Sequence, residues 1–590
     1  MNKQLRAAAL CIALFLVSVF LATPAHAAGV VGDGTPGSCT QAALDTALGG
    51  GGTVTFNCGG PATILMLSEM TISQDTTIRG REQITLTGGL TTRLFRVTAP
   101  AGLTLSDITL DSGYSPTADG GAILSSGTLT LSNVTIENSK AGPAFCGGAL
   151  GSSGLTVITN SRFNKNSAGA GGGAICTGGA MLKIANSILS ENQAAGPTPD
   201  SALGGAILLK QGATMDAGGS TFLLNKADGG GALAISQEAT TTLRAVGEQG
   251  TVFLANSATN SGGAIYNLGY LQVRGGEFNG NTVPQNTVGA GYGGGIANLG
   301  VLTLDSAFLS ANRGRFGGGI FVGGSLDNAR ADLQNAVFAQ NAATGFGGGL
   351  YTNNETTAIT ITHSVFRRNS ADSGGGLARF NAQLYLADSS LAENSAGSAG
   401  GGMYLGAGPA VGSSSYVKVR SVTISSNQAP NGQGGGVYSA SRVELYFSTI
   451  VSNTNGVYGV LGGNTRLRSS VLHNPGFSDC AGDGSTEISN DAANHVSDSS
   501  CGATFLPAGD PQLGPLQDDG RNTTAYHLPL AGSPLINRGH SSCPERDQRG
   551  ALRPDACDIG AVEFEGQIAQ PPPADSDLFL PVIVRPTQQP

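Results

Sequence analysis

Apolar positions in the middle of the chain recur in a fixed relation to asparagine. In eleven places a phenylalanine, leucine or isoleucine stands three residues before an asparagine. The phenylalanine examples pair Phe163 with Asn166, Phe222 with Asn225, Phe253 with Asn256, Phe278 with Asn281, Phe338 with Asn341, and Phe366 with Asn369. The motif returns about every 28 residues, which is the mark of a repeat architecture rather than of one ordinary globular core.

A second motif has the same period and lies between the copies of the first. It is a run of glycines followed by an aliphatic residue, first at Ile123 and last at Val437. Short stretches of alternating apolar and polar residues separate the two motifs, as at 127–131 and 358–362. Alternation with β-branched residues predicts strands, and no helical period competes with it in this region.

These patterns together predict an all-β fold, a right-handed parallel β-helix, because three short strands and three turns fit one repeat. Equivalent residues of successive coils would then stack at the strand spacing of about 4.8 Å. The phenylalanine column should lie inside, and the asparagine column should hydrogen-bond along itself at a turn. The glycine runs suit a tight corner that needs positive φ.

Both ends of such a solenoid need covering, because open strand edges promote aggregation. At the N-terminal end, residues 38–48 have a polar cap and an apolar stripe, which predicts a short helix over the first coil. At the other end we expect a small C-terminal capping module.

The first 27 residues predict a signal peptide. Lys3 and Arg6 precede an apolar stretch at 7–22, and Ala25-His26-Ala27 forms a small-residue cleavage site. No later stretch reaches the roughly 18 apolar residues that a membrane-spanning helix needs. We therefore expect an exported mature chain without a transmembrane segment, extracellular or at the cell surface, where association with the outer membrane remains an option.

The predicted organisation has five parts. They are the signal peptide at 1–27, an N-terminal cap with the first coils at 28–112, the repeats at 113–475, a C-terminal module at 476–566, and a proline-rich linker with a short apolar tail at 567–590.

Eight of the nine cysteines follow the cleavage site, an even number in an oxidising compartment. Neighbours in the sequence give three expected disulfides, Cys39–Cys58, Cys480–Cys501 and Cys543–Cys557. Whether Cys146 pairs with Cys176 is left open, because the two occupy different phases of their repeats. No C-x-x-C motif is present, so we expect no zinc site.

Composition adds few hints about partners. Charged residues make up only 12% of the chain, the formal net charge is −9, and no dense run of Lys and Arg occurs. That excludes an electrostatic footprint for nucleic acid. We expect a monomer without a cofactor, whose partner is an extracellular glycan or protein.

The paired motifs resemble the repeats of polymorphic outer-membrane proteins, known from chlamydial surface proteins, over about 120–455. The resemblance implies a β-helix displayed at the cell surface and linked to adhesion. Those proteins end in an outer-membrane barrel, for which nothing after 455 offers the strands. Residues 510–563 resemble instead a choice-of-anchor module, which implies a structural role before an anchoring tail.

Carbohydrate-active enzymes are also built on β-helices, and they need acidic or basic side chains clustered at one place. The five histidines after the leader are scattered, and the acid pair with Gly-His-Gly typical of polygalacturonases is missing. Asp518-Asp519 is the one tempting carboxylate pair, and its setting favours a turn. Asp547, Arg549, Arg553 and Asp558 are expected to form a structural charge network that closes this module. No catalytic or metal residue is assigned.

One side-chain contact follows from register alone. Arg368 and Glu393 each stand one residue before a ladder asparagine on adjacent coils, so their side chains should be neighbours. The interpretation is a surface ion pair, with catalysis as the weaker alternative.

Two hypotheses for function result. The first is a non-enzymatic β-helix scaffold, secreted or on the cell surface, that serves adhesion or ligand display. The alternative is an extracellular carbohydrate-active enzyme, a polysaccharide lyase or glycoside hydrolase, which would need charged side chains from several coils converging in one groove.

Overall fold

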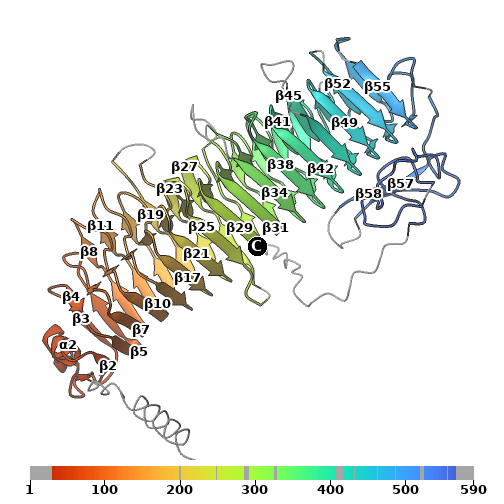
Figure 1. The fold of residues 1–590 in the computed structure, drawn as a ribbon. Coiled ribbons are helices and arrows are strands. Elements are labelled where there is room, and N and C mark those ends of the chain that lie inside the picture. The colour runs from red at the N-terminus through yellow and green to blue at the C-terminus, as the bar shows by residue number, and fades with distance from the viewer. Residues whose placement is uncertain are drawn as a thin grey trace, which may run out of the picture.

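The computed structural model describes residues 29–566, apart from 198–200, 248, 285–290, 325–328, 407–415, 431, 462, 486, 506, 519–523 and 555. Over these residues the chain coils into an elongated rod of stacked parallel strands (Figure 1). The predicted all-β, right-handed parallel β-helix is confirmed. The expected signal peptide and the tail at 567–590 lie outside the described residues.

Three sheets run along the rod, and we name them sheets A, B and C. Sheet A has thirty strands and sheet B has sixteen, while sheet C consists of a six-stranded and a four-stranded part. Sheet B starts at the aliphatic residue that follows each glycine run in the repeat region. Its strands are β4 (Met70–Ile72), β6 (Phe95–Val97), β9 (Ile123–Ser125), β12 (Leu150–Ser152), β16 (Ile175–Thr177), β20 (Ile207–Leu209), β24 (Leu233–Ile235), β28 (Ile265–Asn267), β30 (Ile296–Asn298), β33 (Ile320–Val322), β37 (Leu350–Thr352), β41 (Leu377–Phe380), β45 (Met403–Gly406), β48 (Val437–Ser439), β51 (Val457–Gly459) and β54 (Cys480–Gly482).

Sheet C begins directly after the ladder asparagines in the repeat region. Its six-stranded part contains β8 (Tyr114–Ser115), β11 (Lys140–Ala141), β15 (Ser167–Ala168), β19 (Gln193–Ala194), β23 (Lys226–Gly229) and β27 (Ser257–Ser261). Its four-stranded part contains β32 (Arg313–Gly314), β36 (Ala342–Ala343), β40 (Ser370–Ser373) and β44 (Ser395–Ala399). The coil between β27 and β32 continues the stack through isolated bridges at Thr282 and Tyr292.

The column of apolar residues before the asparagines lies in sheet A. It occupies β14 (Arg162–Asn164), β18 (Ile188–Ser190), β22 (Thr221–Leu223), β26 (Thr251–Leu254), β29 (Tyr270–Asn279), β31 (Val301–Ser310), β35 (Val337–Ala339), β39 (Val365–Arg367), β43 (Ser390–Ala392), β47 (Thr423–Ser425) and β50 (Thr449–Val451). Its side chains point into the rod and join one hydrophobic core that runs through most of the molecule.

The phenylalanines of this column stack face to face. The ring centroids of Phe222 and Phe253 are 4.6 Å apart and those of Phe253 and Phe278 are 4.9 Å apart. Phe338 and Phe366 stack in the same way at 4.4 Å. All of these rings, and that of Phe163, are fully buried.

The asparagine column forms a continuous buried ladder at the turn between sheets A and C. Asn256 Nδ2 donates to Asn281 Oδ1 on the next coil at 3.0 Å and to the Phe222 carbonyl on the previous coil at 2.9 Å. The backbone N–H of Asn256 also donates to Asn281 Oδ1, at 3.0 Å. The same pattern runs through Asn166, Asn192, Asn225, Asn312, Asn341, Asn369, Asn394 and Asn427.

Glycine is required at the corner before sheet B. Gly230 has φ 64°, and a Cβ on it would lie 2.2 Å from the Leu233 carbonyl oxygen. An L side chain would therefore be both strained and in collision.

The N-terminal end is covered by α2 (Gln41–Leu48), which packs on β1 (Gly29–Val31) and β2 (Gly52–Phe56). The Ala43 N–H donates to Thr40 Oγ1 at 3.3 Å, an N-cap, and Leu44 is buried in the core. Cys39 and Cys58 form a disulfide beneath this helix.

The opposite end differs from the prediction in two ways. The coils continue past residue 475, through β55 (Glu487–Ala492) and β56 (His495–Val496), because both strands still pair in parallel with sheet A. The cover of the last coil is the segment after Val496, where Cys501 and Phe505 are buried in the main core and Cys501 forms a disulfide with Cys480. Only this part of the expected C-terminal module caps the rod.

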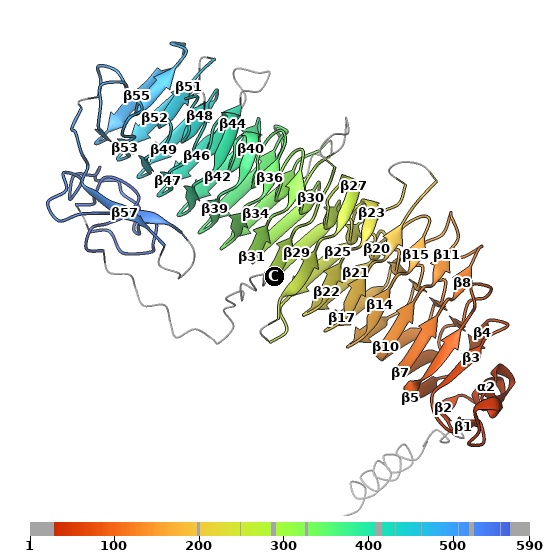
Figure 2. The same cartoon turned by 180° about the vertical axis from the view of Figure 1, so that it is seen from behind.

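The remainder of that module, 510–566, lies against the side of the last coils (Figure 2). It contains the antiparallel pair β57 (Leu513–Gln517) and β58 (Tyr526–Pro529). Leu535 and Ile559 pack on Val451 and Val471, which are outward-facing residues of sheet A. This part of the module thus covers one side of the rod and does not cover its end.

Candidate functional site

A groove opens on the sheet C side of the rod, with a volume of about 1030 Å³. Its floor is made by β19, β23 and β27 and by the following coil, and it ends at Arg313 of β32. Gly196, Pro197 and Pro284, which belong to turns longer than the short corners elsewhere, stand at its sides. This volume is at the upper end of the about 300–1,000 Å³ typical of ligand sites.

One column of side chains runs along the groove, one residue from each coil. Lys226 pairs in register with Ser257, which bridges to Thr282, which in turn bridges to Arg313. Three coil steps therefore separate the two cations, about 14 Å at the strand spacing. Both cationic side chains are exposed.

The remaining polar lining consists of hydroxyl and amide groups and one carboxylate, Asp228. Of the described residues that line the groove, Asp228 alone carries an acidic side chain. Its Oδ1 accepts from Thr259 Oγ1 at 3.0 Å and its Oδ2 from the Ala202 N–H at 3.2 Å. This carboxylate is thus held by neutral donors of the groove wall.

Small apolar residues alternate with these polar groups along the strands. Ala194, Ala227 and Ala258 occupy neighbouring positions one residue after the polar column, and Val283 extends the row. These four side chains are buried, so the hydroxyl, amide and charged groups of the column are what the floor offers to a ligand.

A second lateral feature is a stripe of aromatic rings on the outer surface of sheet B, which we name the aromatic stripe. It contains Tyr292, Phe316, Phe321, Phe346, Tyr351, Phe380, Tyr404, Tyr438 and Tyr458, with neighbouring ring centroids 4.7–6.2 Å apart. Phe321 and Tyr351 are only 4% and 8% exposed. Burial raises the pKa of Tyr351 to about 12. The rings therefore form mainly an outer packing layer.

The open question about Cys146 and Cys176 is settled by the same columns, because the two cysteines form a disulfide across adjacent coils. Cys176 pairs in register with Gly151 on the previous coil, and Cys146 bridges Gly171 on the next. Two different positions of the repeat thus lie side by side at one corner of adjacent coils. The glycines opposite the two cysteines leave room for the sulfur atoms.

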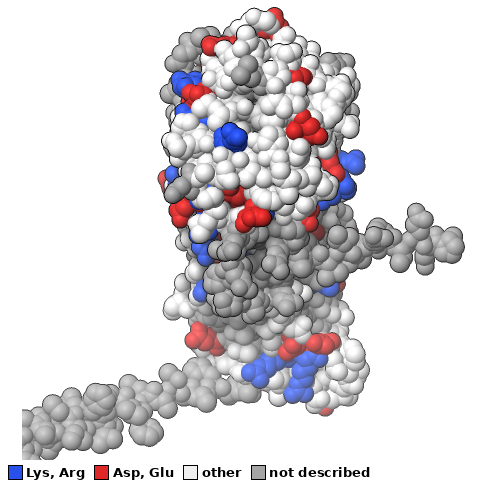
Figure 3. All heavy atoms as spheres, turned by 90° about the vertical axis from the view of Figure 1, so that its right-hand side faces the viewer, with Lys and Arg blue, Asp and Glu red and all other residues white. Residues whose placement is uncertain are grey.

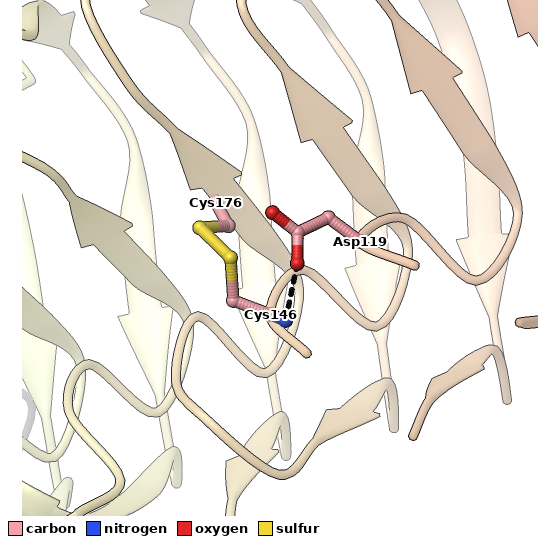
Figure 4. Close-up of side chains that lie close together, drawn as sticks. All are labelled: Asp119, Cys146 and Cys176. Atoms are coloured by element: carbon pink, nitrogen blue, oxygen red, sulfur yellow. Dashed lines mark hydrogen bonds between the residues drawn. A yellow bond between two sulfur atoms is a disulfide. The ribbon is translucent and has the colours of Figure 1, made fainter. Parts of the chain in front are cut away.

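Asp119 lies beside this disulfide and completes a cluster whose ligand atoms could hold a metal ion if the sulfurs were free (Figure 4). In the structure the sulfurs are bonded to each other. Asp119 Oδ1 accepts from the Cys146 N–H at 2.9 Å, and Asp119 Oδ2 pairs with Lys210 Nζ at 3.1 Å. The disulfide, the hydrogen bond and the ion pair occupy the sulfur and carboxylate atoms that would have to bind a metal ion, so the cluster does not fit one.

The third expected disulfide is absent from the structure, where Cys543 and Cys557 are free thiols. The sulfur of Cys557 is directed at the His540 carbonyl oxygen, 3.2 Å away, and that of Cys543 at the Pro554 carbonyl oxygen, 3.9 Å away. Burial is the first cause that raises the pKa of Cys557 to about 12, and the neighbouring Cys543 thiol adds to it. The expected bond is therefore not formed in this structure, although the two thiols are close enough to hydrogen-bond to each other.

The acidic and basic residues that the sequence suggested in the C-terminal module form ion pairs within the protein. Arg549 Nη2 donates to Asp547 Oδ2 at 2.8 Å, and Arg553 pairs with Glu563. Asp518 pairs with Arg367 of the rod at 3.3 Å. Asp519 lies outside the described residues, so the suspected carboxylate pair is not brought together in them.

Arg368 and Glu393 lie where register predicts them. Arg368 Nε donates to Glu393 Oε2 at 2.6 Å, and both side chains are substantially exposed. Arg367 approaches the same carboxylate at 3.5 Å. This is a solvent-accessible ion-pair cluster.

Sequence reasoning missed the groove residues, although a signal was present. Lys226, Ser257, Thr282 and Arg313 each follow a ladder asparagine directly. Aligning the repeats on that asparagine would have shown the column. The depth of the groove depends on the lengths of neighbouring turns, which the repeat pattern does not fix.

The face of the molecule in Figure 3 carries charges of both signs. On its described part, acidic and basic side chains are scattered among uncharged ones without a continuous patch of either sign. None of the described helices has the length and hydrophobicity needed to cross a membrane.

Fold and groove together define a right-handed parallel β-helix with a ligand-sized opening on its side. Residues 301–475 match the family model of the right-handed β-helix region. Residues 160–178 and 250–268 match the model of the Chlamydia polymorphic membrane protein repeat. Both matches fall on the coils described above.

Among curated proteins, the chain is similar to a probable autotransporter, YfaL, of Escherichia coli strain K12. The two are 30% identical over 146 residues, which is 24% of this chain and 10% of the relative. The chain thus spans about a tenth of the length of the curated relative that it matches.

Solved structures with a similar fold include a mannuronic acid specific polysaccharide family 6 lyase from human gut microbiota, at 12% identity and a TM-score of 0.32, covering 68% of this chain and 82% of the lyase. A family 6 alginate lyase, AlyGC, has 10% identity and a TM-score of 0.29, covering 79% of this chain and 80% of that enzyme. The A-module of the mannuronan C-5 epimerase AlgE6 of Azotobacter vinelandii has 12% identity and a TM-score of 0.26, covering 79% of this chain and 98% of the module. These likenesses concern the fold alone.

Proposed function

We propose that this protein is an extracellular β-helix scaffold, secreted or held at the cell surface, that binds a glycan or protein ligand on its side without chemical turnover. The repeats matching the Chlamydia polymorphic membrane protein model and the similarity to a probable autotransporter support a place at the cell surface. Adhesion or ligand display is the role that such a rod serves best.

The observation that carries the binding role is the composition of the groove. It offers hydroxyls, amides and two cations, but its described lining holds only one carboxylate, Asp228. Hydrolysis of a glycosidic bond ordinarily uses two carboxylates on either side of that bond. Because Asp228 already accepts two hydrogen bonds from the wall, the lining suits holding a ligand more than cleaving one.

The test has two parts. Fractionation of cells that produce the protein should place it at the surface or in the medium, and recovery only from the cytoplasm would contradict the proposal. Purified protein incubated with polyuronate and neutral glycan panels should retain ligands on a binding assay. Release of unsaturated or reducing sugar ends, lost in Asp228→Asn, would instead favour the carbohydrate-active enzyme.

A further inference from the structure

We infer that the groove on sheet C is a binding site for an acidic glycan, whose carboxylate or sulfate groups are held by Lys226, one coil in from the β19 end, and by Arg313 at the other end. This inference rests on the proposed binding function and names the ligand class of the same site.

Within the part of the chain that the structure describes, neither cation forms an ion pair with a carboxylate, and the ion pairs of lysine and arginine involve other side chains. By contrast, Arg244 and Arg368 are each paired with an acid on an adjacent coil, and Lys210 is paired with Asp119 three coils away. Within a protein of net charge −9, two such cations in one groove favour an anionic ligand.

Between the cations, the floor matches the chemistry of sugar rings. Ser257 and Thr282 present hydroxyls in the column that joins Lys226 to Arg313. Asn260 also lines the groove. The hydroxyl groups of a sugar chain can both donate to and accept from hydroxyl side chains, so this part of the floor suits a glycan.

The strand pairing of the floor disfavours an extended peptide. Peptides commonly bind a sheet by adding a strand to a free edge, where backbone groups are unpaired. Here β23 lies between β19 and β27, and Ser257 bridges onward to Thr282. The groove crosses strands that are already paired on both sides, so the ligand must bind through side chains, as a glycan does.

The long axis of the groove sets the ligand length. Lys226 and Arg313 lie three coil steps apart, about 14 Å at the strand spacing. Two anionic groups on different units of one oligosaccharide would span them, whereas a single small anion would reach only one.

The experiment measures binding of four probes to the purified full chain by calorimetry: an oligogalacturonate, a heparin oligosaccharide, a neutral glucan oligomer and poly-glutamate. We expect binding of one or both acidic glycans that weakens as salt is raised, because exposed charges are screened. Lys226→Gln with Arg313→Gln should weaken it about tenfold, since each exposed ion contact contributes modestly. The matched control is Lys183→Gln, which removes an exposed cation from β17 (Met181–Ala185) on sheet A.

Each outcome decides the matter. Loss of acidic-glycan binding in the double variant, with the control unchanged, supports the inference. The preference between oligogalacturonate and heparin then tells carboxylate from sulfate. Equal binding of the neutral glucan, or acidic-glycan binding that the double variant retains, overturns the acidic ligand but leaves the binding function standing. Binding of poly-glutamate alone assigns the groove to an acidic protein, and binding of no probe overturns the inference.

Discussion

The Nδ2 of Asn341 donates a hydrogen bond to Oδ1 of Asn369 on the next coil at 3.0 Å, and neither residue is exposed to solvent. The backbone N–H of Asn341 donates to the same oxygen at 3.0 Å. Each ladder amide therefore satisfies buried backbone groups as well as its neighbour in the column, which explains why asparagine recurs at this turn.

Replacing Asn256 by alanine should lower the local free energy of unfolding by about 2–4 kcal/mol, because the Asn225 N–H and Nδ2 lose their acceptor inside the protein. Hydrogen exchange of the amides on the two flanking coils measures the effect. Asn279→Ala is the control, since Asn279 lies in strand conformation at the end of β29, is partly exposed, and donates from Nδ2 to Glu277 Oε1 at 3.4 Å. Equal exchange in both variants would mean that the ladder is not what secures this turn.

Replacing Phe253 by alanine should cost about 3–5 kcal/mol, as expected for truncation of a buried aromatic side chain. Its ring lies between those of Phe222 and Phe278, so the cavity has two stacked walls. Thermal melting or local hydrogen exchange would report the loss. Phe477→Ala, at a position that is 51% exposed, should change little, and a parent-like melt of Phe253→Ala would refute the internal column.

The ion pair of Arg368 with Glu393 should contribute little to stability. A double-mutant cycle with alanine at both positions is expected to give a coupling of at most about 1 kcal/mol, because both side chains are exposed to solvent and to salt. The cycle is best measured at low and at high ionic strength. A coupling of several kcal/mol that survives high salt would show that this cluster has a larger role.

The contact of the C-terminal module with the rod should weaken in acid. His527 Nδ1 donates to the Gly514 carbonyl at 2.8 Å, so Nε2 is left to accept from Ser425 Oγ at 2.9 Å. Burial holds the pKa of His527 below its ordinary value. The folded state thus binds fewer protons than the unfolded state, and stability is lost as pH falls through about 6.5.

Hydrogen exchange of the module between pH 7.5 and 5.5 tests this. His527→Gln, which keeps hydrogen-bonding groups but does not titrate, should flatten the pH dependence. An equally steep dependence in that variant would assign the effect to another group, of which buried His495 is the first to examine, since burial also lowers its pKa.

Register made the interior of this protein predictable. The phenylalanine and asparagine columns, and the contact of Arg368 with Glu393, follow from one period because a parallel coil places equivalent residues over one another. Turn length and docking could not be obtained in this way. The groove is lined by Pro197 and Pro284, which stand in turns whose lengths no repeat position encodes.

The disulfides also divide into those that the sequence predicts and one that it does not. Cys39–Cys58 and Cys480–Cys501 could be expected from nearness in the sequence. The bond between Cys146 and Cys176 required knowledge that two phases of the repeat meet at one corner. The lateral position of residues 510–566 depends on contacts more than a hundred residues apart, such as Ala525 with Ser390, which composition and spacing do not reveal.

The docked module also constrains how this molecule can evolve in length. Where coils pair only with their neighbours, as around Ile265, gene recombination can delete or duplicate a whole unit and leave a shorter or longer rod that still folds. Between Ser390 and Val471, deletion or duplication of a coil would move the rod residues that contact the C-terminal module away from their partners in it. Size variation among descendants of this gene should therefore accumulate in the first two thirds of the rod.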